Sequence, residues 1–267
     1  MRSQKLAIEA RAGEGLPFLA PVPFDGLGRR FDAFEAEGAS LIGRLVSPSG
    51  QRAYRLRSDR DEVVLNYSFA LDPDAPTPKW LWRHDPNPLS TASPQLADFA
   101  RAIAKPCAAE TVRSIADHVA TTFHYGPGSG RFTDGRDSVP LVCSKTRGTC
   151  IDIHTYFCAA LRASGIEAAY VAGIFIGEGS DEATDMHCWV AVRCGDLVEE
   201  WDLSHALMTG RSPAPGLTEI AGRRVSLSAG RGLRFAIDGE AFDLSHLALP
   251  CDLNGNAFRA RATLGLG

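Results

Sequence analysis

The sequence predicts an α+β protein, in which a β-rich N-terminal part precedes a core of helices and antiparallel strands. Three observations predict this class. Apolar and polar residues alternate within the first 90 residues, as they do in half-buried strands. Apolar residues then recur at helical spacing from residue 93 to residue 165, and a buried strand and a hairpin follow up to residue 202.

The clearest strand of the N-terminal part is EVVLNYSFAL at residues 62–71, where every second side chain is apolar. Before it, LIGRLV and QRAYRLR flank the turn-forming residues 47–50, which predicts a hairpin. Two proline-rich stretches, DPDAPTPKW and HDPNPLSTASP, predict a long connection that ends near Ser93. We therefore expect a β-rich N-terminal domain at residues 1–90 and a core with a C-terminal β extension at residues 91–267.

Three helices are expected in the middle of the chain. The first begins with Ser93 as its N-cap, followed by a proline at the first helical position. The second carries apolar residues at helical spacing over residues 112–123. The third begins at Cys150, in the sequence GTCIDIHTYFCAALRASGI, and Gly165 ends it in the C-terminal cap position.

A buried strand, AAYVAGIFIG, and a hairpin of MHCWVAVRC with LVEEWD follow the third helix. A turn at residues 195–196 places Asp202, at the end of its strand, opposite Trp189. His187 then lies diagonal to Asp202 on the same face, about 7–8 Å away between backbones, which an imidazole and a carboxylate can span. Residues 203–267 are weakly patterned, apart from a small hairpin in FAIDGEAFDL.

Cys150, His187 and Asp202 stand in the order and setting of a thiol-nucleophile triad. At a helix N-terminus, unpaired N–H groups and the helix dipole stabilise a thiolate by about 0.3–1 kcal/mol. A histidine takes the thiol proton when an aspartate holds its second nitrogen. Each residue alone has an ordinary explanation, as a small residue at a helix start, a core histidine or a turn-forming aspartate. Their combination predicts acyl transfer from an amide or ester.

The surroundings of Cys150 suggest how an oxyanion would be bound. The backbone N–H of Cys150 faces the place where the oxyanion would form, and Gly148 would allow close approach of a substrate backbone. The second donor stays open between Lys145 and a backbone N–H. Asp152 is expected to stabilise the helix start as a first-turn acid, with contact to a substrate amine as the alternative.

About 60 residues around these three positions resemble the core of the transglutaminase-like superfamily. Its bacterial members carry a Gly-x-Cys, a helix ending in Leu-Arg-x-x-Gly-Ile, a Tyr-Val-x-Gly strand, a His followed by Trp, and a Trp-Asp segment. The chain has all five in order, at Cys150, Leu161–Ile166, Tyr170–Gly173, His187-Cys188-Trp189 and Trp201-Asp202.

The resemblance implies a papain-like α+β fold, with the cysteine-bearing helix packed on an antiparallel sheet. It also implies Cys150 as nucleophile, His187 as general base and then acid, and Asp202 as the group that orients the imidazole. The chain departs from the family pattern in two places. Cys188 stands where the family often has alanine, and Asp202 is followed by Leu-Ser rather than Pro-Thr.

Composition limits the partners and the location that we expect. A net charge of -4 does not point to nucleic acid or to a membrane, and no apolar run approaches the ~18 residues of a membrane span. The N-terminus lacks the apolar stretch of a signal peptide. Seven cysteines, an odd number without a dense framework, favour a reducing compartment, so we expect a cytoplasmic protein.

No metal or cofactor is expected. His154 lies one turn after Cys150, which invites a zinc site with His187 and Cys188. Zinc sites usually contain close ligand pairs such as Cys-x-x-Cys, however, and the chain has none.

We therefore expect a cysteine-dependent acyl-transfer enzyme that acts on a peptide or small amide through a thioester, most simply with water as acceptor, as a peptidase or deamidase. The first alternative is a transglutaminase or amide synthase with an amine acceptor. The second is a non-catalytic binding module that uses the β-rich N-terminus for recognition. The sequence leaves the substrate, the acyl acceptor and the oligomeric state open.

Overall fold

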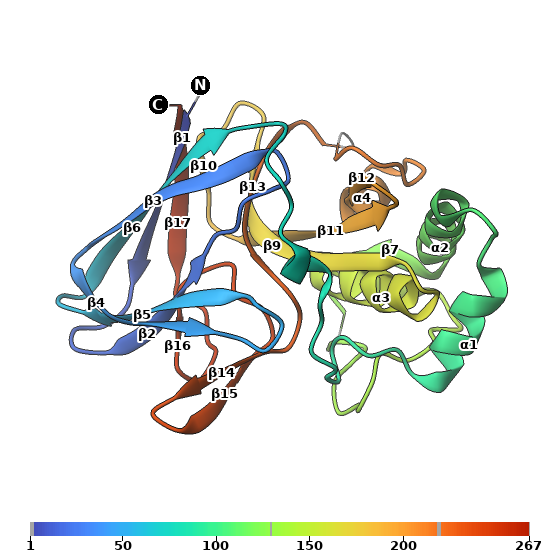
Figure 1. Cartoon of the computed structure of the whole chain (residues 1–267), viewed down its shortest axis with the longest axis horizontal. Coiled ribbons are helices and arrows are strands. Elements are labelled where there is room, and N and C mark those ends of the chain that lie inside the picture. Colours follow the sequence, from blue (N-terminus) through green and yellow to red (C-terminus); the bar gives the residue numbers. More distant parts are fainter. Residues whose placement is uncertain (1–2, 129, 218–219, 267) are drawn as a thin grey trace. The chain divides into compact units, whose positions relative to one another are not determined.

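A computed structural model of the chain describes residues 3–128, 130–217 and 220–266. The chain has the predicted α+β class and forms two compact units, each assembled from separate segments (Figure 1). The β unit consists of Met1–Arg83, Ala172–His187 and Gly222–Gly267. The α+β unit consists of His84–Val171 and Cys188–Ala221. Two strands, β9 (Glu167–Gly177) and β11 (Met186–Cys194), contribute residues to both units.

The β unit contains two larger sheets, with the strand orders β10-β17-β1-β6-β3 and β16-β2-β5-β4. The bounds of the first are Glu182–Ala183, Ala260–Leu266, Ser3–Arg11, Glu62–Leu71 and Arg29–Glu37. Those of the second are Cys251–Asp252, Pro17–Val22, Arg52–Ser58 and Ala39–Val46. Both sheets contribute side chains to one hydrophobic core, because their strands alternate apolar and polar residues as predicted for residues 62–71.

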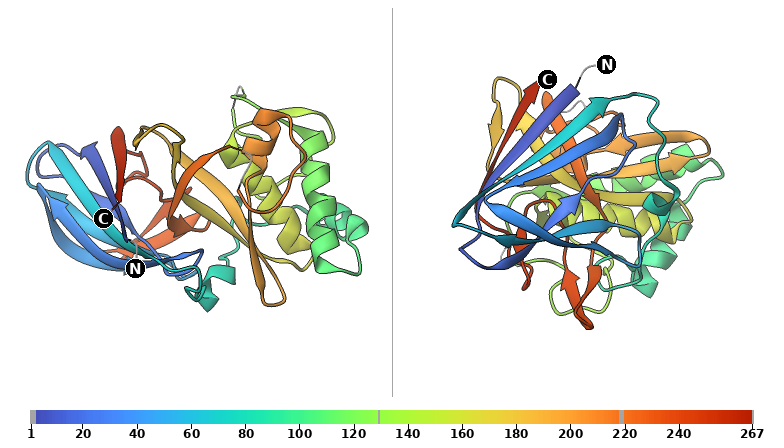
Figure 2. Two further views of the ribbon diagram at one scale, coloured as in Figure 1. Left: turned by 90° about the horizontal axis from the view of Figure 1, so that it is seen from above. Right: turned by 60° about the vertical axis from the view of Figure 1, so that its left-hand side comes forward.

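The first and last strands of the β unit pair with each other. β1 is antiparallel to β17 on one side and to β6 on the other, with Leu6 opposite both Leu264 and Tyr67. Both views of Figure 2 show β1 and β17 side by side. The C-terminal segment, weakly patterned in the sequence, is therefore part of the sheet that the N-terminus begins.

Three further strands of the β unit lie in this C-terminal segment. The hairpin of β14 (Leu233–Ile237) and β15 (Glu240–Leu244) was predicted, and both residues of its turn, Asp238 and Gly239, have positive φ. β13 (Gly222–Ala229) lies beside the second half of β9. Gly173 permits this approach, because a Cβ there would overlap the carbonyl group of Val225.

The α+β unit contains the three predicted helices. Their bounds are Pro94–Ile103 for α1, Ala108–Thr122 for α2 and Cys150–Ala163 for α3. Ser93 caps α1 as expected, since its hydroxyl accepts the N–H of Leu96 at 3.2 Å. Both α1 and α2 pack against α3 (Figure 1).

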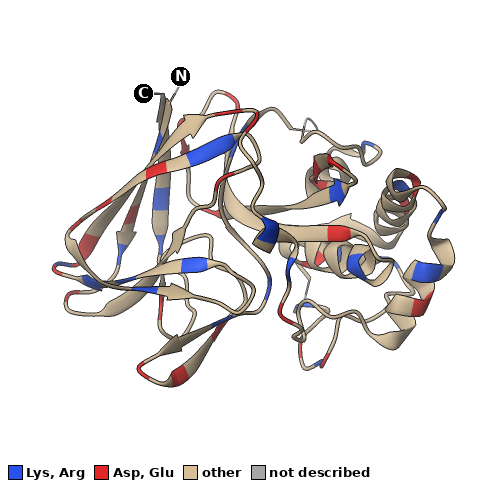
Figure 3. Cartoon of the chain, viewed as in Figure 1, with Lys and Arg blue, Asp and Glu red and all other residues tan. Residues whose placement is uncertain are grey.

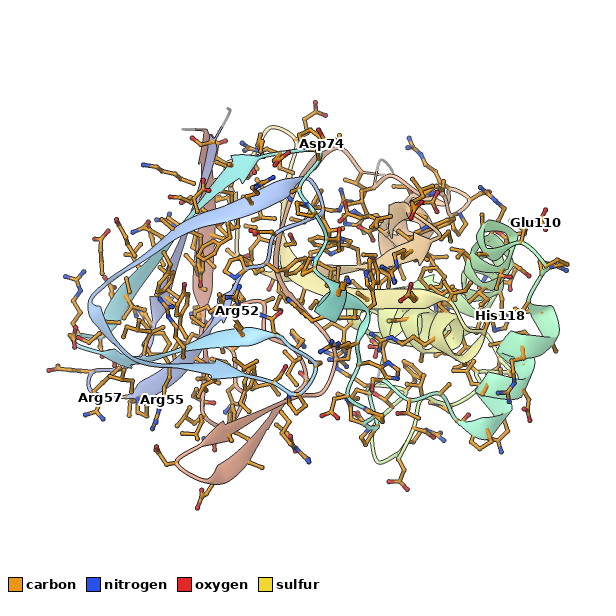
Figure 4. The ribbon with its side chains drawn as sticks, viewed as in Figure 1. Arg52, Arg55, Arg57, Asp74, Glu110 and His118 are labelled. Atoms are coloured by element: carbon orange, nitrogen blue, oxygen red, sulfur yellow. The ribbon has the colours of Figure 1, made fainter. Side chains whose placement is uncertain are left out.

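His118 on α2, labelled in Figure 4, joins the three helices. Its Nε2 lies 2.9 Å from the hydroxyl of Tyr156 on α3, and its ring lies against Phe99 of α1. The remaining elements of the unit are the parallel pair β7 (Phe123–Tyr125) and β8 (Thr146–Gly148), the strand β12 (Leu197–Trp201) and the helix α4 (Leu203–Thr209).

Charged residues of both signs are interspersed along both units (Figure 3). Among the described residues, no helix is long and apolar enough to cross a membrane.

Candidate active site

Cys150 is the first residue of α3 and is largely buried, with 9% of its surface exposed. The helix start is fixed by a capping box in which the carboxylate of Asp152 accepts both the backbone N–H of Thr149, at 3.0 Å, and its hydroxyl, at 2.8 Å. Arg131 adds an ion pair to the same carboxylate at 3.3 Å. Asp152 therefore stabilises the helix start, as predicted, and Arg131 is a cation near Cys150 that the sequence did not reveal.

Gly148 has a packing role that the sequence did not predict. A Cβ at this position would lie 3.0 Å from the ring of Phe123 and 3.1 Å from Cβ of Asp152. The glycine thus lets β8 pack closely against β7 and the first turn of α3. Lys145, considered as an oxyanion donor, is exposed in the loop before β8.

The hairpin of β11 and β12 has the predicted register. Cys194 lies opposite Leu197, and the ladder continues to the pair of Val190 and Trp201. Trp189 and Trp201 are both buried, and each donates its indole N–H to a glutamate of β12, at 2.6 Å and 3.3 Å respectively. They pack within the unit, since Trp201 also contacts Phe157 of α3.

Asp202 corrects one expectation from the sequence. It does not end a strand: β12 ends at Trp201, and Asp202 is the N-cap of α4. The reason is that aspartate is among the strongest N-cap residues, and Gly210, in the left-handed conformation, ends a short helix. These cap signals were present in the sequence but were overlooked because residues 203–209 lack clear apolar spacing.

The carboxylate of Asp202 is fully buried and accepts several hydrogen bonds. Oδ1 accepts the hydroxyl of Ser204 at 2.7 Å and the backbone N–H of His205 at 3.1 Å. Oδ2 lies 3.0 Å from Nδ1 of His205, and Oδ1 lies 3.6 Å from Nε2 of His154. The carboxylate of Asp202 is therefore held in place by its own helix and lies close to two imidazoles.

His154 connects α3 to this carboxylate and to Cys188. It is completely buried, its Nδ1 lies 3.5 Å from Sγ of Cys188, and its Nε2 accepts the backbone N–H of Leu203 at 3.0 Å. Because Nε2 already accepts this hydrogen bond, its lone pair is not available to a metal ion. Sequence reasoning missed His205 altogether and considered His154 only as a possible zinc ligand. Their spacing, four residues after Cys150 and three after Asp202, was the available signal.

His187 is the second residue of β11 and belongs to the β unit, whereas Cys150 and Asp202 belong to the α+β unit. It is buried, and its ring lies 5.7 Å from the ring of Phe175 on β9. The guanidinium of Arg224 lies over the same Phe175 ring, 4.6 Å from its centre. The convergence of Cys150, His187 and Asp202 stays a prediction.

The other buried thiols lie in environments that do not favour a nucleophilic thiolate. Burial raises the pKa of Cys158 and of Cys188, the latter well above its ordinary value, and raises the pKa of Cys251 to about 12. The exposed thiols are Cys107 and Cys143. The three buried thiols stay protonated at neutral pH. The reactivity of a nucleophilic cysteine is therefore best compared with that of Cys107 and Cys143.

Comparison with known proteins defines the class. Residues 97–201 match the model of the transglutaminase-like superfamily, a span that includes Cys150 and His187 and ends one residue before Asp202. The match supports, for this part of the chain, the resemblance to the transglutaminase-like superfamily that the sequence suggested. No curated protein matches the chain.

One solved structure supports the same fold, and a second is reported beside it. A protein from Cytophaga hutchinsonii, described as a putative cysteine protease, is 13% identical, with a TM-score of 0.52 over 99% of this chain and 98% of that chain. The periplasmic domain of TgpA from Pseudomonas aeruginosa is 14% identical, with a TM-score of 0.42 over 78% of this chain and 89% of that chain. The first likeness supports the fold, and the family match supports a cysteine-based enzyme in general terms.

Proposed function

We propose that the protein is a cysteine-dependent acyl-transfer enzyme in which Cys150 is the nucleophile, His187 the general base and Asp202 the orienting acid. One observation supports the proposal more strongly than the others. Cys150 begins a capped, well-packed helix within the segment that matches the transglutaminase-like superfamily. The N–H groups of the first helical turn favour a thiolate at this position.

The proposed reaction has two stages. His187 takes the proton of the Cys150 thiol, and the thiolate attacks the carbonyl carbon of an amide to give a tetrahedral oxyanion. The C–N bond then breaks, His187 returns the proton to the leaving amine, and a thioester remains on Cys150. Water, deprotonated by the same imidazole, attacks the thioester and releases a carboxylic acid and the thiol.

Asp202 fits the third role because its buried carboxylate accepts the hydroxyl of Ser204 and the backbone N–H of His205, which hold it in one orientation. A carboxylate that is held in this way can orient an imidazole. The register of β11 with β12 is confirmed as far as the pair of Val190 and Trp201, and the approach of His187 to Asp202 beyond this pair is part of the proposal.

We infer that the acceptor is water, which makes the enzyme a peptidase or deamidase for a peptide-like or small amide substrate. Water needs no second binding site, whereas an amine acceptor does. The alternatives are a transglutaminase or amide synthase and a non-catalytic module on the same fold. The proposal includes a cytoplasmic location, because seven cysteines without a dense framework favour a reducing compartment.

Acyl trapping tests the proposal. The full chain is incubated with a panel of activated ester and amide probes, and intact mass and peptide mapping locate the acyl group. We expect a hydroxylamine-sensitive acyl adduct on Cys150 that is absent from Cys150→Ser. Addition of a primary amine such as cadaverine should leave the carboxylic acid as the main product.

Other outcomes separate the alternatives. Transfer of the acyl group to cadaverine in preference to water would assign an acyltransferase. A lack of adduct with every probe, in a protein that is folded by circular dichroism, would contradict the enzyme and favour the binding module.

A further inference from the structure

The β unit leaves two neighbouring strand edges unpaired. Among the described strands, β3 pairs only with β6 and β4 pairs only with β5, so each is the last strand of its sheet. The two strands follow each other in the chain and are joined at Gly38 (Figure 1). Each edge therefore presents backbone N–H and C=O groups that no neighbouring strand uses.

A groove of about 410 Å³ lies along these two edges. Its lining includes runs of consecutive residues, 31–34 of β3 and 44–46 of β4. Consecutive side chains of a strand point to opposite faces, so a cavity that touches all of them borders the edge of the strand. The groove thus lies beside the unpaired backbone groups, and its volume is within the range of about 300–1,000 Å³ that ligand sites have.

Apolar side chains form the floor and part of the rim of the groove. The rings of Phe34 and Tyr54 stack with 4.1 Å between their centres, and both line the groove. At the rim, Leu41 is 49% exposed and Val46 is 62% exposed. Apolar side chains of a partner would therefore remove a continuous apolar surface from water.

Two guanidinium groups lie near the last residues of β4. That of Arg44 lies over the ring of Tyr54, 5.7 Å from its centre, and Arg52 is opposite Val46 in the ladder. Both arginines are exposed, and neither forms an ion pair with an acidic residue in the part of the chain that the structure describes. Asp32 is the one acid of the lining. The excess of positive charge therefore fits a partner that brings carboxylates to this end of the groove.

The two edges differ in how well they would receive another strand. β3 exposes three acidic side chains, Asp32, Glu35 and Glu37. Charged side chains of this kind protect an edge from pairing. β4 instead exposes the apolar side chains of Leu41 and Val46, and its ladder with β5 is regular over residues 43–46. β4 is therefore the receptive edge.

We propose that the groove binds an extended peptide segment with apolar side chains and an acidic end, which pairs with β4 as an added strand. Backbone hydrogen bonds to the edge supply affinity, and the side chains supply specificity. The apolar side chains cover the aromatic floor, and the carboxylates pair with Arg44 and Arg52. The inference concerns the β unit alone and goes beyond the proposed chemistry at Cys150.

Fluorescence anisotropy of the full chain with labelled peptides tests this binding. The first peptide, Val-Thr-Val-Thr-Val-Glu-Glu, is extended and acidic at one end. Replacing both glutamates by lysine reverses the charge, and replacing both threonines by proline removes backbone donors that an added strand needs. We expect saturable binding of the first peptide and about tenfold weaker binding of the other two.

Matched variants locate the site. Arg52→Gln should weaken binding of the first peptide about fivefold, because one ion pair is lost. Arg57→Gln removes an exposed arginine of the same strand that does not line the groove, so it should leave binding unchanged (Figure 4). Leu41→Ser should also weaken binding about fivefold. Leu16→Ser, at a position 53% exposed outside the groove, is its control.

Three results would overturn the proposal. The first is a lack of binding of any peptide to the folded chain. The second is equal binding of the three peptides, or equal losses in Arg52→Gln and Arg57→Gln. The third is self-association of the chain in sedimentation experiments that Leu41→Ser abolishes, because the edge of β4 would then be occupied by a second copy.

Discussion

Asp202 has a structural role in the fold and a chemical role in the proposed function, and the two can be separated. It caps α4 through the N–H of His205, whereas the proposed role needs its charge to orient an imidazole. Asparagine is an equally good N-cap but carries no charge.

We therefore predict that Asp202→Asn changes the free energy of unfolding by less than about 1 kcal/mol. Turnover of the best trapping substrate should fall by about two to four orders of magnitude, because the imidazole loses its orienting charge. Denaturant unfolding and single-turnover kinetics measure the two effects. Asp202→Ala, which removes the cap as well, should lose both activity and stability. Full activity in Asp202→Asn would contradict the orienting role.

His154 gives a second prediction at the scale of one residue. His154→Leu keeps a similar volume but leaves the buried N–H of Leu203 without its acceptor, which costs about 1–3 kcal/mol. His124→Leu is the control. Its buried Nδ1 has no hydrogen-bond partner among the described residues, so replacing this ring loses no hydrogen bond at that nitrogen. Chemical denaturation should therefore show a larger loss for His154→Leu, and equal losses would argue against this hydrogen bond.

The residue scale also shows what the sequence could and could not predict. The positions of Cys150 at a helix start and of His187 early in a strand followed from local patterns and are confirmed. The contacts of His154 with Cys188 and Leu203 join residues 34 and 49 positions apart, and no local pattern specifies such pairs.

At the scale of elements, the start of α3 is the feature on which the site most depends. Asp152 accepts two hydrogen bonds from Thr149, the residue directly before Cys150, and forms an ion pair with Arg131. The capping box therefore fixes the helix end that would stabilise the thiolate.

We predict that Asp152→Ala lowers the free energy of unfolding by about 1–2 kcal/mol and slows alkylation of Cys150, because the first turn of α3 frays. Glu110→Ala is the matched control, since Glu110 is an exposed acid in the first turn of α2 (Figure 4). Its loss should stay within about 0.5 kcal/mol and leave Cys150 unaffected. Thermal unfolding and peptide-resolved labelling measure both. An alkylation rate of Cys150 that is unchanged in Asp152→Ala would show that the helix cap does not affect the reactivity of this thiol.

Elements with strong local signals were predictable. Ser93, the hairpin turns and the register of β11 with β12 follow from capping and turn chemistry. α4 was missed because it is seven residues long and has little apolar periodicity, so only its caps mark it.

At the scale of the whole molecule, the last strand completes the sheet that the first strand begins. β17 pairs with β1 over seven residue pairs and also with β10, and its inward side chains join the main core of the β unit. The sequence could not predict this pairing, because the paired residues are 250 or more positions apart and the partner of a strand depends on the whole fold.

Leu264 tests the contribution of β17 to the β unit. It is 3% exposed and lies opposite Leu6, so Leu264→Ala should cost about 2–5 kcal/mol of stability by leaving a cavity. Leu16→Ala, at a position 53% exposed, should stay within about 0.5 kcal/mol. Equal losses of stability for the two variants in urea unfolding would show that β17 does not contribute to the stability of the core.

The central claim is that the imidazole of His187 activates the thiol of Cys150, and one measurement tests it most directly. The iodoacetamide rate of Cys150 at neutral pH is compared between the wild type and His187→Ala, with Cys107 and Cys143 as exposed reference thiols in the same sample. The account predicts that Cys150 reacts faster than both references in the wild type and loses this advantage in His187→Ala. A Cys150 rate that is the same in both proteins would contradict it.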